Sequence, residues 1–183
     1  MPQSPYVRWF SDIRLDDVAL VGGKTASLGE LYSTLSGQDI RVPNGFAITA
    51  RAYYDALTAA DAWGTLHGLL DRLEKTDVER LKTCAAKARS IVYEATRRSD
   101  LRDEAVIAYR ELEKQHGDGV AVAVRSSATA EDLPNASFAG QHESFLNVRG
   151  EDDLFEACRR CFASITGVYG LGEHIVQGTV DPD

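Results

Sequence analysis

The sequence contains few cysteines, and their number and spacing exclude two classes of small structural site. It has three cysteines, an odd number that argues against a disulfide framework. Cys158 and Cys161 stand in a Cys-x-x-Cys pattern within a predicted helix, but a zinc site would need two more soft ligands and none is clustered nearby. We therefore expect Cys84, Cys158 and Cys161 to be free thiols, buried or partly buried, and we expect no zinc.

The sequence also lacks a long hydrophobic run and a surplus of positive charge. No run approaches the roughly 20 apolar residues of a membrane span, and Pro2, Pro5, Arg8 and Asp12 stand where a signal peptide would have its apolar core. Twenty Lys and Arg residues face 28 Asp and Glu residues, which gives a net charge of −8 and disfavours nucleic acids and anionic membranes. We expect a cytoplasmic protein with no nucleic-acid and no membrane partner.

The residues that are present suffice for one hydrophobic core. The chain has 183 residues, of which 44% are hydrophobic, so we expect residues 1–183 to form one domain. Helical and strand-like patterns are mixed, which predicts an α+β fold with a helical portion over about residues 50–116. We predict helices over residues 24–35, after an N-cap at Thr49, and over 76–95, 101–117 and 151–165. We predict a short extended segment at 42–48 and strands at 120–124 and 145–148.

A strand-like run leads directly into an arginine and a loop of small residues. Val120–Val124 is apolar and rich in valine, so it predicts a core strand, and Arg125 follows where that strand leaves the core. A guanidinium can hold phosphate oxygens through its planar fork of donors. The loop adds hydroxyls, and a glycine where the backbone can approach an anion: Ser126, Ser127, Thr129, Ser137 and Gly140. The alternative is an arginine that satisfies a strand-end carbonyl beside a loop that merely turns.

A glycine pair precedes a lysine where a helical pattern begins. Lys24 follows Gly22 and Gly23, and a lysine beside a helix N-terminus suits an anion. A Walker P-loop is excluded, because Asp17 stands where its first glycine is required. The alternative is a turn before an amphipathic helix whose Leu28, Leu31 and Leu35 face the core.

Four separated segments occur in an order that is typical of one family. They are residues 22–30 (GGKTASLGE), 42–47 (VPNGFA), 123–143 and 170–173 (GLGE). The chain resembles the pyruvate phosphate dikinase family, and within it the phosphoenolpyruvate synthases (pyruvate, water dikinases). The similarity is to the N-terminal ATP-binding domain of these enzymes. It implies a partial ATP-grasp-type nucleotide-binding domain with a helical insertion.

The resemblance implies roles for particular residues. Lys24 and Arg125 match the lysine and arginine that contact ATP phosphates. Residues 137–143 match a phosphate loop whose backbone near Gly140 lies against the terminal phosphates, with His142 where the family usually has glutamine. Further ATP-binding matches are Gln141, Glu173 and the neighbouring Gln177, and Glu173 is also implied as a Mg²⁺ ligand. From the residues alone, Glu173 is equally well a solvated glutamate at a helix start.

This chain departs from the family pattern in two places. Residues 151–165 are followed almost at once by the 170–173 motif, where the family has further strands and helices, so we expect an internal deletion near residues 165–167. The family also continues beyond the position of Asp183, into a phosphohistidine domain and a barrel that binds pyruvate and phosphoenolpyruvate. None of the four histidines lies in the phosphohistidine motif. We expect one incomplete domain that has no catalytic residue of its own.

The function implied by the resemblance is the ATP-binding part of a phosphoenolpyruvate synthase. That enzyme uses ATP, Mg²⁺ and water to convert pyruvate to phosphoenolpyruvate through a phosphohistidine, and we expect the 183-residue chain to be inactive by itself. Two alternatives stay open. One is the ATP domain of a rifamycin phosphotransferase, although residues 71–81 and 176–183 are more similar to the synthase. The other is a non-catalytic remnant or regulatory module, which the deletion favours.

Overall fold

The computed structural model describes residues 4–38, 40, 42–70, 78–127, 143–166 and 178–182. Helices and strands are mixed within this part of the chain, so the expected α+β class is confirmed. The α-helices are α1 (Val18–Leu35), α2 (Ala50–Ala59), α3 (Trp63–Leu70), α4 (Val78–Ala95), α5 (Ser99–His116) and α6 (Glu151–Thr166). The strands are β1 (Val7–Trp9), β2 (Phe46–Ile48), β3 (Val122–Ser126), β4 (Ser144–Val148) and β5 (Gly178–Pro182), and three short 3-10 turns are η1 (Phe10–Asp12), η2 (Leu15–Asp17) and η3 (Ser36–Gln38).

The strands form one sheet in the order β1-β2-β5-β3-β4. Every neighbouring pair is antiparallel. The last strand in the sequence, β5, therefore lies in the middle of the sheet, where Val180 pairs with Phe46 of β2 on one side and with Val124 of β3 on the other. The sheet joins chain segments that are more than a hundred residues apart.

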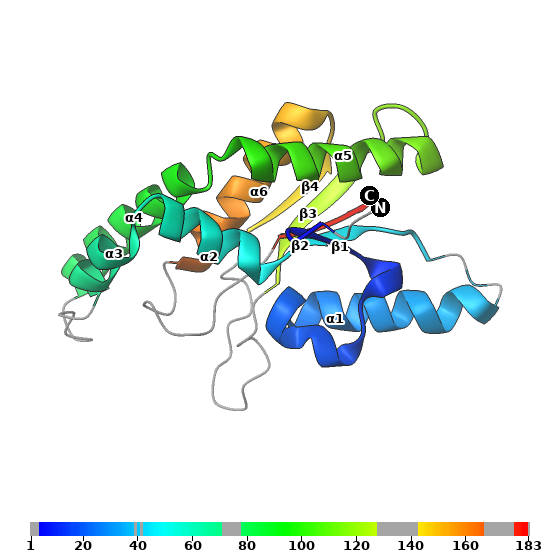
Figure 1. The fold of residues 1–183 in the computed structure, drawn as a ribbon, viewed down its shortest axis with the longest axis horizontal. Coiled ribbons are helices and arrows are strands. Elements are labelled where there is room, and N and C mark those ends of the chain that lie inside the picture. The colour runs from blue at the N-terminus through cyan, green and yellow to red at the C-terminus, as the bar shows by residue number, and fades with distance from the viewer. Residues whose placement is uncertain are drawn as a thin grey trace.

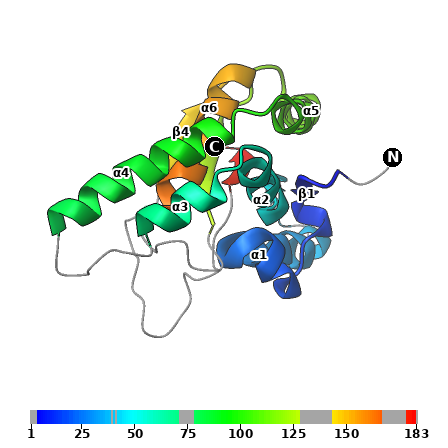
Figure 2. The same cartoon turned by 60° about the vertical axis from the view of Figure 1, so that its left-hand side comes forward.

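The two faces of the sheet are covered by different helices. Figure 1 shows α1 below the sheet and α5 above it, and Figure 2 shows the same separation after the turn. Strand β2 contributes to both sides because successive side chains point to opposite faces. Phe46 and Ile48 enter a large hydrophobic cluster with α2 to α6, whereas Ala47 enters a small cluster with α1 and η1.

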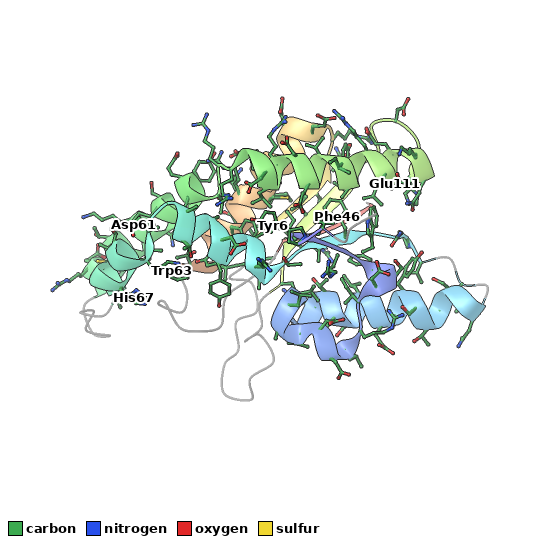
Figure 3. The ribbon with its side chains drawn as sticks, in the orientation of Figure 1. Tyr6, Phe46, Asp61, Trp63, His67 and Glu111 are labelled. Atoms are coloured by element: carbon green, nitrogen blue, oxygen red, sulfur yellow. The ribbon has the colours of Figure 1, made fainter. Side chains whose placement is uncertain are left out.

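The large cluster is built from the apolar stripes of the helices. Tyr53 of α2, Tyr109 of α5 and Phe162 of α6 are fully buried in it. Figure 3 shows Phe46 in the sheet and Trp63 on α3, toward the far end of the layer of helices. The apolar positions of α6 that the helical spacing predicts to face the core are all buried, which confirms that prediction: Leu154, Phe155, Cys158, Phe162 and Ile165.

Most of the predicted elements are confirmed within a few residues. The strand predicted over 120–124 is β3, at Val122–Ser126, and the strand predicted beside it at 145–148 is its antiparallel neighbour β4. Helix α5 ends at Gly117, whose φ of 102° is in the region that favours glycine. Thr76 and Asp77, the predicted capping residues of α4, lie outside the described residues.

Thr49 occupies the N-cap position of α2, as predicted, but its hydroxyl does not cap the helix. No side-chain hydrogen bond to the first turn of α2 is formed. The Thr49 Oγ1 instead donates to the carbonyl oxygen of Pro5 at 3.0 Å. The hydroxyl is buried, so it must find a partner, and the segment before β1 supplies one. The prediction of a side-chain cap at Thr49 is wrong for this reason.

The three cysteines are free thiols, as predicted. Cys158 and Cys161 are buried in α6, and Cys84 is partly buried. Burial raises the pKa of the Cys158 thiol to about 12 and raises the pKa of Cys161 well above its usual value, because a thiolate is poorly solvated in an apolar core. Both thiols are packing residues at neutral pH.

None of the helices in the described ranges is both long enough and apolar enough to span a bilayer.

Candidate phosphate-binding site

Lys24 and Arg125, which stand in separate sequence motifs, line the same surface pocket. Lys24 lies in α1 and Arg125 in β3, and both side chains are exposed. The pocket has a volume of about 330 Å³, which is within the range of small-molecule sites. We call it the Lys24–Arg125 pocket. Its lining residues are Gly23, Lys24, Ser27, Leu28, Leu31, Arg125 and Ser126.

The pleat of β3 explains why Arg125 reaches this pocket. Val122 and Val124 are buried in the large cluster on the side of α6. Since side chains alternate along a strand, Arg125 projects from the opposite face of the sheet, which is the face that α1 covers. Arg125 is also the exposed residue of the strand. A cation at this position can reach the surface without crossing the core.

A break in α1 brings Lys24 to the same place. Gly22 has φ 73° and ψ 162°, so the helix is interrupted there although it continues on both sides. This backbone conformation favours glycine. The glycine pair predicts a turn at Gly22 followed by a helix over 24–35. The helix after the turn is confirmed, but α1 already begins at Val18.

Ser127 occupies the break. Its hydroxyl donates to the carbonyl oxygen of Val21 at 3.1 Å and accepts a hydrogen bond from the amide of Thr25 at 3.2 Å. A regular α-helix would join Thr25 directly to Val21, because its amides bond to the carbonyl four residues earlier. A side chain from the end of β3 is thus inserted into the hydrogen-bond ladder of α1, which is a known physical cause of helix kinks.

The interruption of α1 adds positive charge to the pocket. Gly23 and Lys24 are the first residues after the break, so the amino-terminal end of a helical segment lies at the pocket, with its partial positive charge. Lys24 and Arg125 add two full positive charges, and none of the described lining residues is acidic. This arrangement favours an anion.

Part of the pocket lining is apolar. Leu28 and Leu31 belong to it. The alternative interpretation of residues 24–35 predicts that Leu31 faces the core, and this is wrong, because Leu31 is 50% exposed. Leu28 does pack partly against the small cluster. A ligand with an anionic group and an apolar group would match both kinds of lining residue.

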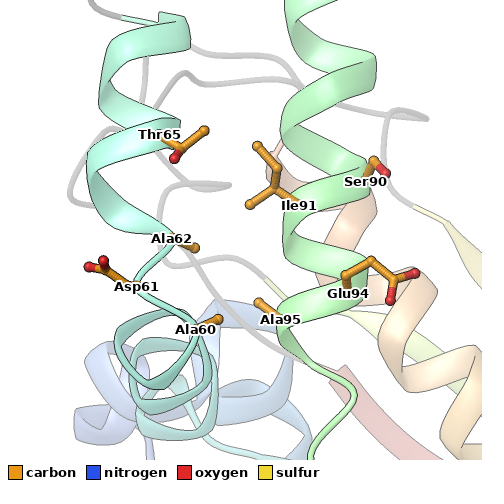
Figure 4. Close-up of a pocket in the computed structure, with 8 residues that line it drawn as sticks. All are labelled: Ala60, Asp61, Ala62, Thr65, Ser90, Ile91, Glu94 and Ala95. Atoms are coloured by element: carbon orange, nitrogen blue, oxygen red, sulfur yellow. The ribbon is translucent and has the colours of Figure 1, made fainter.

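Among the described residues, a second pocket is lined by acidic residues and not by basic ones. It has a volume of about 400 Å³ and lies between α3 and α4 (Figure 4). Asp61 and Glu94 are among its lining residues, and none of the described residues around it is basic. Figure 4 shows Ile91 of α4 pointing into the space between the two helices. An anionic ligand is therefore better matched by the Lys24–Arg125 pocket.

Five of the seven predicted ATP-binding residues lie outside the described residues: Gly140, Gln141, His142, Glu173 and Gln177. The same is true of Thr129 and Ser137. Their predicted roles stay predictions. Within the described ranges, no group of three or more His, Cys, Asp or Glu side chains is arranged to hold a metal ion.

Sequence reasoning missed the role of Ser127. The sequence predicts that Ser127, like Ser126, offers its hydroxyl to an anion, but the Ser127 hydroxyl is buried and bonded within the protein. A ligand contact and an internal hydrogen bond can be told apart here only from the contact between two segments that are 102 residues apart. The presence of Leu31 at the pocket could have been suspected from its spacing, because residues 24, 28 and 31 share one helix face.

Comparisons with known proteins agree on one family. The family described as "Pyruvate phosphate dikinase, AMP/ATP-binding domain" matches residues 18–167. The phosphoenolpyruvate synthase of Pseudomonas aeruginosa is 38% identical over 97% of this chain, and that of Helicobacter pylori is 42% identical over 97%. The phosphoenolpyruvate synthase of Escherichia coli is 40% identical over 96%. The chain spans 29% of the length of the first two relatives and 22% of the third.

Proposed function

The chain belongs to the family of the pyruvate phosphate dikinase AMP/ATP-binding domain, and from that membership we propose that the Lys24–Arg125 pocket binds the phosphates of ATP. The observation that carries the proposal is that two cations predicted from separate sequence segments line one pocket. Their charges and the helix end suit an anion. The fold that we propose is of the ATP-grasp type.

The two cations have different chemistry toward a phosphate chain. Arg125 presents a planar fork that can bind two oxygens at once, whereas Lys24 presents a compact charge that can move between neighbouring oxygens. In phosphoryl transfer, negative charge spreads over the oxygens of the transferred group, and cations fixed around them stabilise that charge. Lys24 and Arg125 would bind, orient and neutralise the phosphates.

Mg²⁺ is proposed to enter with the nucleotide. Magnesium in such sites is usually held by phosphate oxygens together with one or two carboxylates. The described residues that line the pocket include no carboxylate, so they do not form a metal site by themselves. Glu173 is the proposed protein ligand, with Gln177 as its neighbour, and residues 137–143 with Gly140, Gln141 and His142 are the proposed phosphate loop.

For the whole protein we propose phosphoenolpyruvate synthesis from pyruvate, ATP and water through a phosphohistidine. The named relatives are phosphoenolpyruvate synthases, which favours this activity over rifamycin phosphotransfer. The phosphohistidine domain and the barrel for pyruvate and phosphoenolpyruvate are the proposed further parts. The role of the present chain would be to bind ATP.

A second candidate is a chain that binds phosphate without supporting turnover. The alignment with the P. aeruginosa enzyme runs over 232 residues, more than the 183 residues of this chain. The relative therefore has residues without a counterpart here, as an internal deletion such as the one that we predict would give. The alignment with the E. coli enzyme, in contrast, covers 96% of this chain over 175 residues. If part of the cleft is missing, ATP binding would persist through its phosphates alone.

Calorimetry with Mg-ATP on the 183-residue chain tests the proposal. Lys24→Ala and Arg125→Ala should each weaken binding about 10-fold or more, because each removes a charged contact. Lys82→Ala is the matched control, since Lys82 pairs with Glu79 on the exposed surface of α4, and it should leave the affinity unchanged. Equal affinities in all four proteins would refute the proposed site.

A further inference from the structure

We infer that Ser127 is a positioning residue whose hydroxyl holds α1 in its interrupted form and thereby keeps Lys24 and Arg125 in one pocket. The inference rests on the proposed function only for the identity of the ligand. Its structural part concerns the backbone at Gly22 and can be tested without any ligand.

The first step is the position of the hydroxyl within the helix ladder. Val21 and Thr25 are four residues apart, so their backbone groups would pair directly in a continuous helix. In this protein the Ser127 Oγ lies between them, at 3.1 Å from the Val21 oxygen and 3.2 Å from the Thr25 nitrogen. One hydroxyl replaces one backbone hydrogen bond and satisfies both of its groups.

The second step is that these groups have little access to water. Val21, Thr25 and Ser127 are all fully buried. Buried backbone groups are almost always paired, and leaving one unpaired is strongly unfavourable. In a continuous helix the Thr25 amide and the Val21 carbonyl would pair with each other. Gly22 can adopt helical angles as readily as its present ones, so nothing in its own chemistry prevents α1 from closing.

The third step links the hydroxyl to the pocket. Ser127 is two residues after Arg125, and Thr25 follows Lys24 directly, so the hydrogen bond to Ser127 ties together the backbone segments that carry the two cations. Closing the ladder would change the angles at Gly22 and so move Lys24 relative to Arg125. The pocket therefore depends on a residue whose own side chain is fully buried.

The adjacent Ser126 illustrates the difference between the two serines. Its Oγ is buried and has no hydrogen-bond partner within the described part of the chain. The Ser127 hydroxyl, in contrast, is bonded to α1 through Val21 and Thr25. The positioning role thus belongs to one of two chemically identical side chains.

The experiment compares the wild type with Ser127→Ala, using Thr96→Val as the matched control. Thr96 is also fully buried, and its hydroxyl donates to the Val92 carbonyl in α4, away from the pocket. Backbone NMR of Gly22, through its coupling constants and Cα shift, reports whether φ is positive. Calorimetry with inorganic tripolyphosphate, below the unfolding temperature of each variant, reports the affinity of the folded protein.

We expect Gly22 to move to helical angles in Ser127→Ala and tripolyphosphate to bind about 10-fold more weakly. Adding Lys24→Ala should then weaken binding less than it does in the wild type, because Lys24 has already left its place. Thr96→Val should lower the unfolding temperature without changing the Gly22 angles or the affinity. A purely structural role of Ser127 would make both serine and threonine variants behave alike.

A positive φ at Gly22 in Ser127→Ala would overturn the inference, and so would an unchanged affinity for tripolyphosphate. If Ser127→Ala does not fold, Ser127→Cys keeps most of the volume while weakening both hydrogen bonds, and the same two measurements apply to it. A wild-type chain that binds no tripolyphosphate would refute the proposed function. The structural part of the inference would then be tested by the backbone angles of Gly22 alone.

Discussion

Gly22 and Ser127 approach each other so closely that no side chain fits between them. A Cβ atom on Gly22 would lie 2.4 Å from the Ser127 Oγ and 2.5 Å from the Ser127 carbonyl oxygen. The contact joins the break in α1 to the end of β3. It explains why a glycine is required at this position by space as well as by its φ of 73°.

Gly22→Ala should therefore destabilise the protein strongly. The new methyl group would contact backbone atoms of Ser127 that cannot rotate away, and alanine is strained at this φ. We expect the free energy of unfolding to fall by about 2–4 kcal/mol, measured by urea denaturation.

Gly64→Ala is the control for this prediction. Gly64 lies in α3, and a Cβ there would meet nothing within 4 Å. Alanine is a better helix former than glycine, so this change should raise stability by about 0.5–1 kcal/mol. Similar unfolding free energies for the two alanine variants would show that the close contact at Gly22 does not limit stability.

Arg125→Lys should not restore the affinity that Arg125→Ala loses. The charge is kept, but a point ammonium cannot reproduce the planar fork of a guanidinium. We expect Mg-ATP to bind about 10-fold more weakly than to the wild type, measured by calorimetry. Arg51→Lys changes an exposed arginine that pairs with Asp55 on α2, and it should have no effect. Wild-type affinity in Arg125→Lys would contradict bidentate binding.

The 183-residue chain should bind ATP at about millimolar affinity or more weakly, and should discriminate poorly between ATP and GTP. The proposed contacts of Lys24 and Arg125 would form with any triphosphate, whereas the predicted deletion would remove part of the base pocket. Because attraction to phosphate is screened by salt, raising the ionic strength from about 0.05 to about 0.5 M should weaken binding further. Micromolar affinity for ATP with a clear preference over GTP would show a complete base pocket.

The cysteines should differ in reactivity. Burial raises the pKa of Cys158 to about 12 and that of Cys161 well above its usual value, so neither forms the reactive thiolate near pH 8 in the folded protein. We expect a thiol reagent to label Cys84 in the native protein and all three cysteines in denaturant, as counted by mass spectrometry. Rapid native labelling of Cys158 would show that α6 opens readily.

Asp100 should contribute modestly to stability above acidic pH. The hydrogen bond from the Arg98 guanidinium lowers the pKa of Asp100 below its usual value. A lowered folded pKa means that the contribution is present above the unfolded pKa of about 3.9 and is lost as the pH falls through the folded pKa. Because both side chains are partly exposed, Asp100→Asn should cost at most about 1 kcal/mol at pH 7.

The pH dependence distinguishes this ion pair from a loss of packing. The difference between Asp100→Asn and the wild type should shrink toward zero as the pH approaches about 2, where the wild-type carboxylate is protonated as well. Asp103→Asn, at an exposed position of the same helix, should change the unfolding free energy little at any pH. A difference that stays constant down to low pH would contradict the prediction.

Local patterns in the sequence were sufficient for most helices and for two strands. The end of α5 at Gly117, the valine run of β3 and the apolar face of α6 are all visible without a structure. These signals are local, because the spacing of hydrophobic residues and the presence of a helix-ending glycine can be recognised within one or two helical turns. The same patterns marked Lys24 and Arg125 as candidates for an anion site.

The central strand was not predicted. Residues 178–182 form β5 between β2 and β3, yet the segment is short and ends in Asp181 and Pro182, which are poor strand residues. Its place depends on pairing with two strands from earlier in the chain. Strand pairing is a contact between distant segments, and the sequence of one segment carries little information about it.

What the sequence by itself determined is which residues can serve the site: a glycine pair, a lysine after it, and an arginine at the end of an apolar strand. What only the tertiary structure decided is their arrangement. The Ser127 hydroxyl enters the ladder of α1 across 102 residues of sequence, and a helix break that depends on such a partner has no local signal. Whether a buried polar group is hydrogen-bonded depends on both segments that meet there. It can therefore be determined only when the two segments are folded against each other.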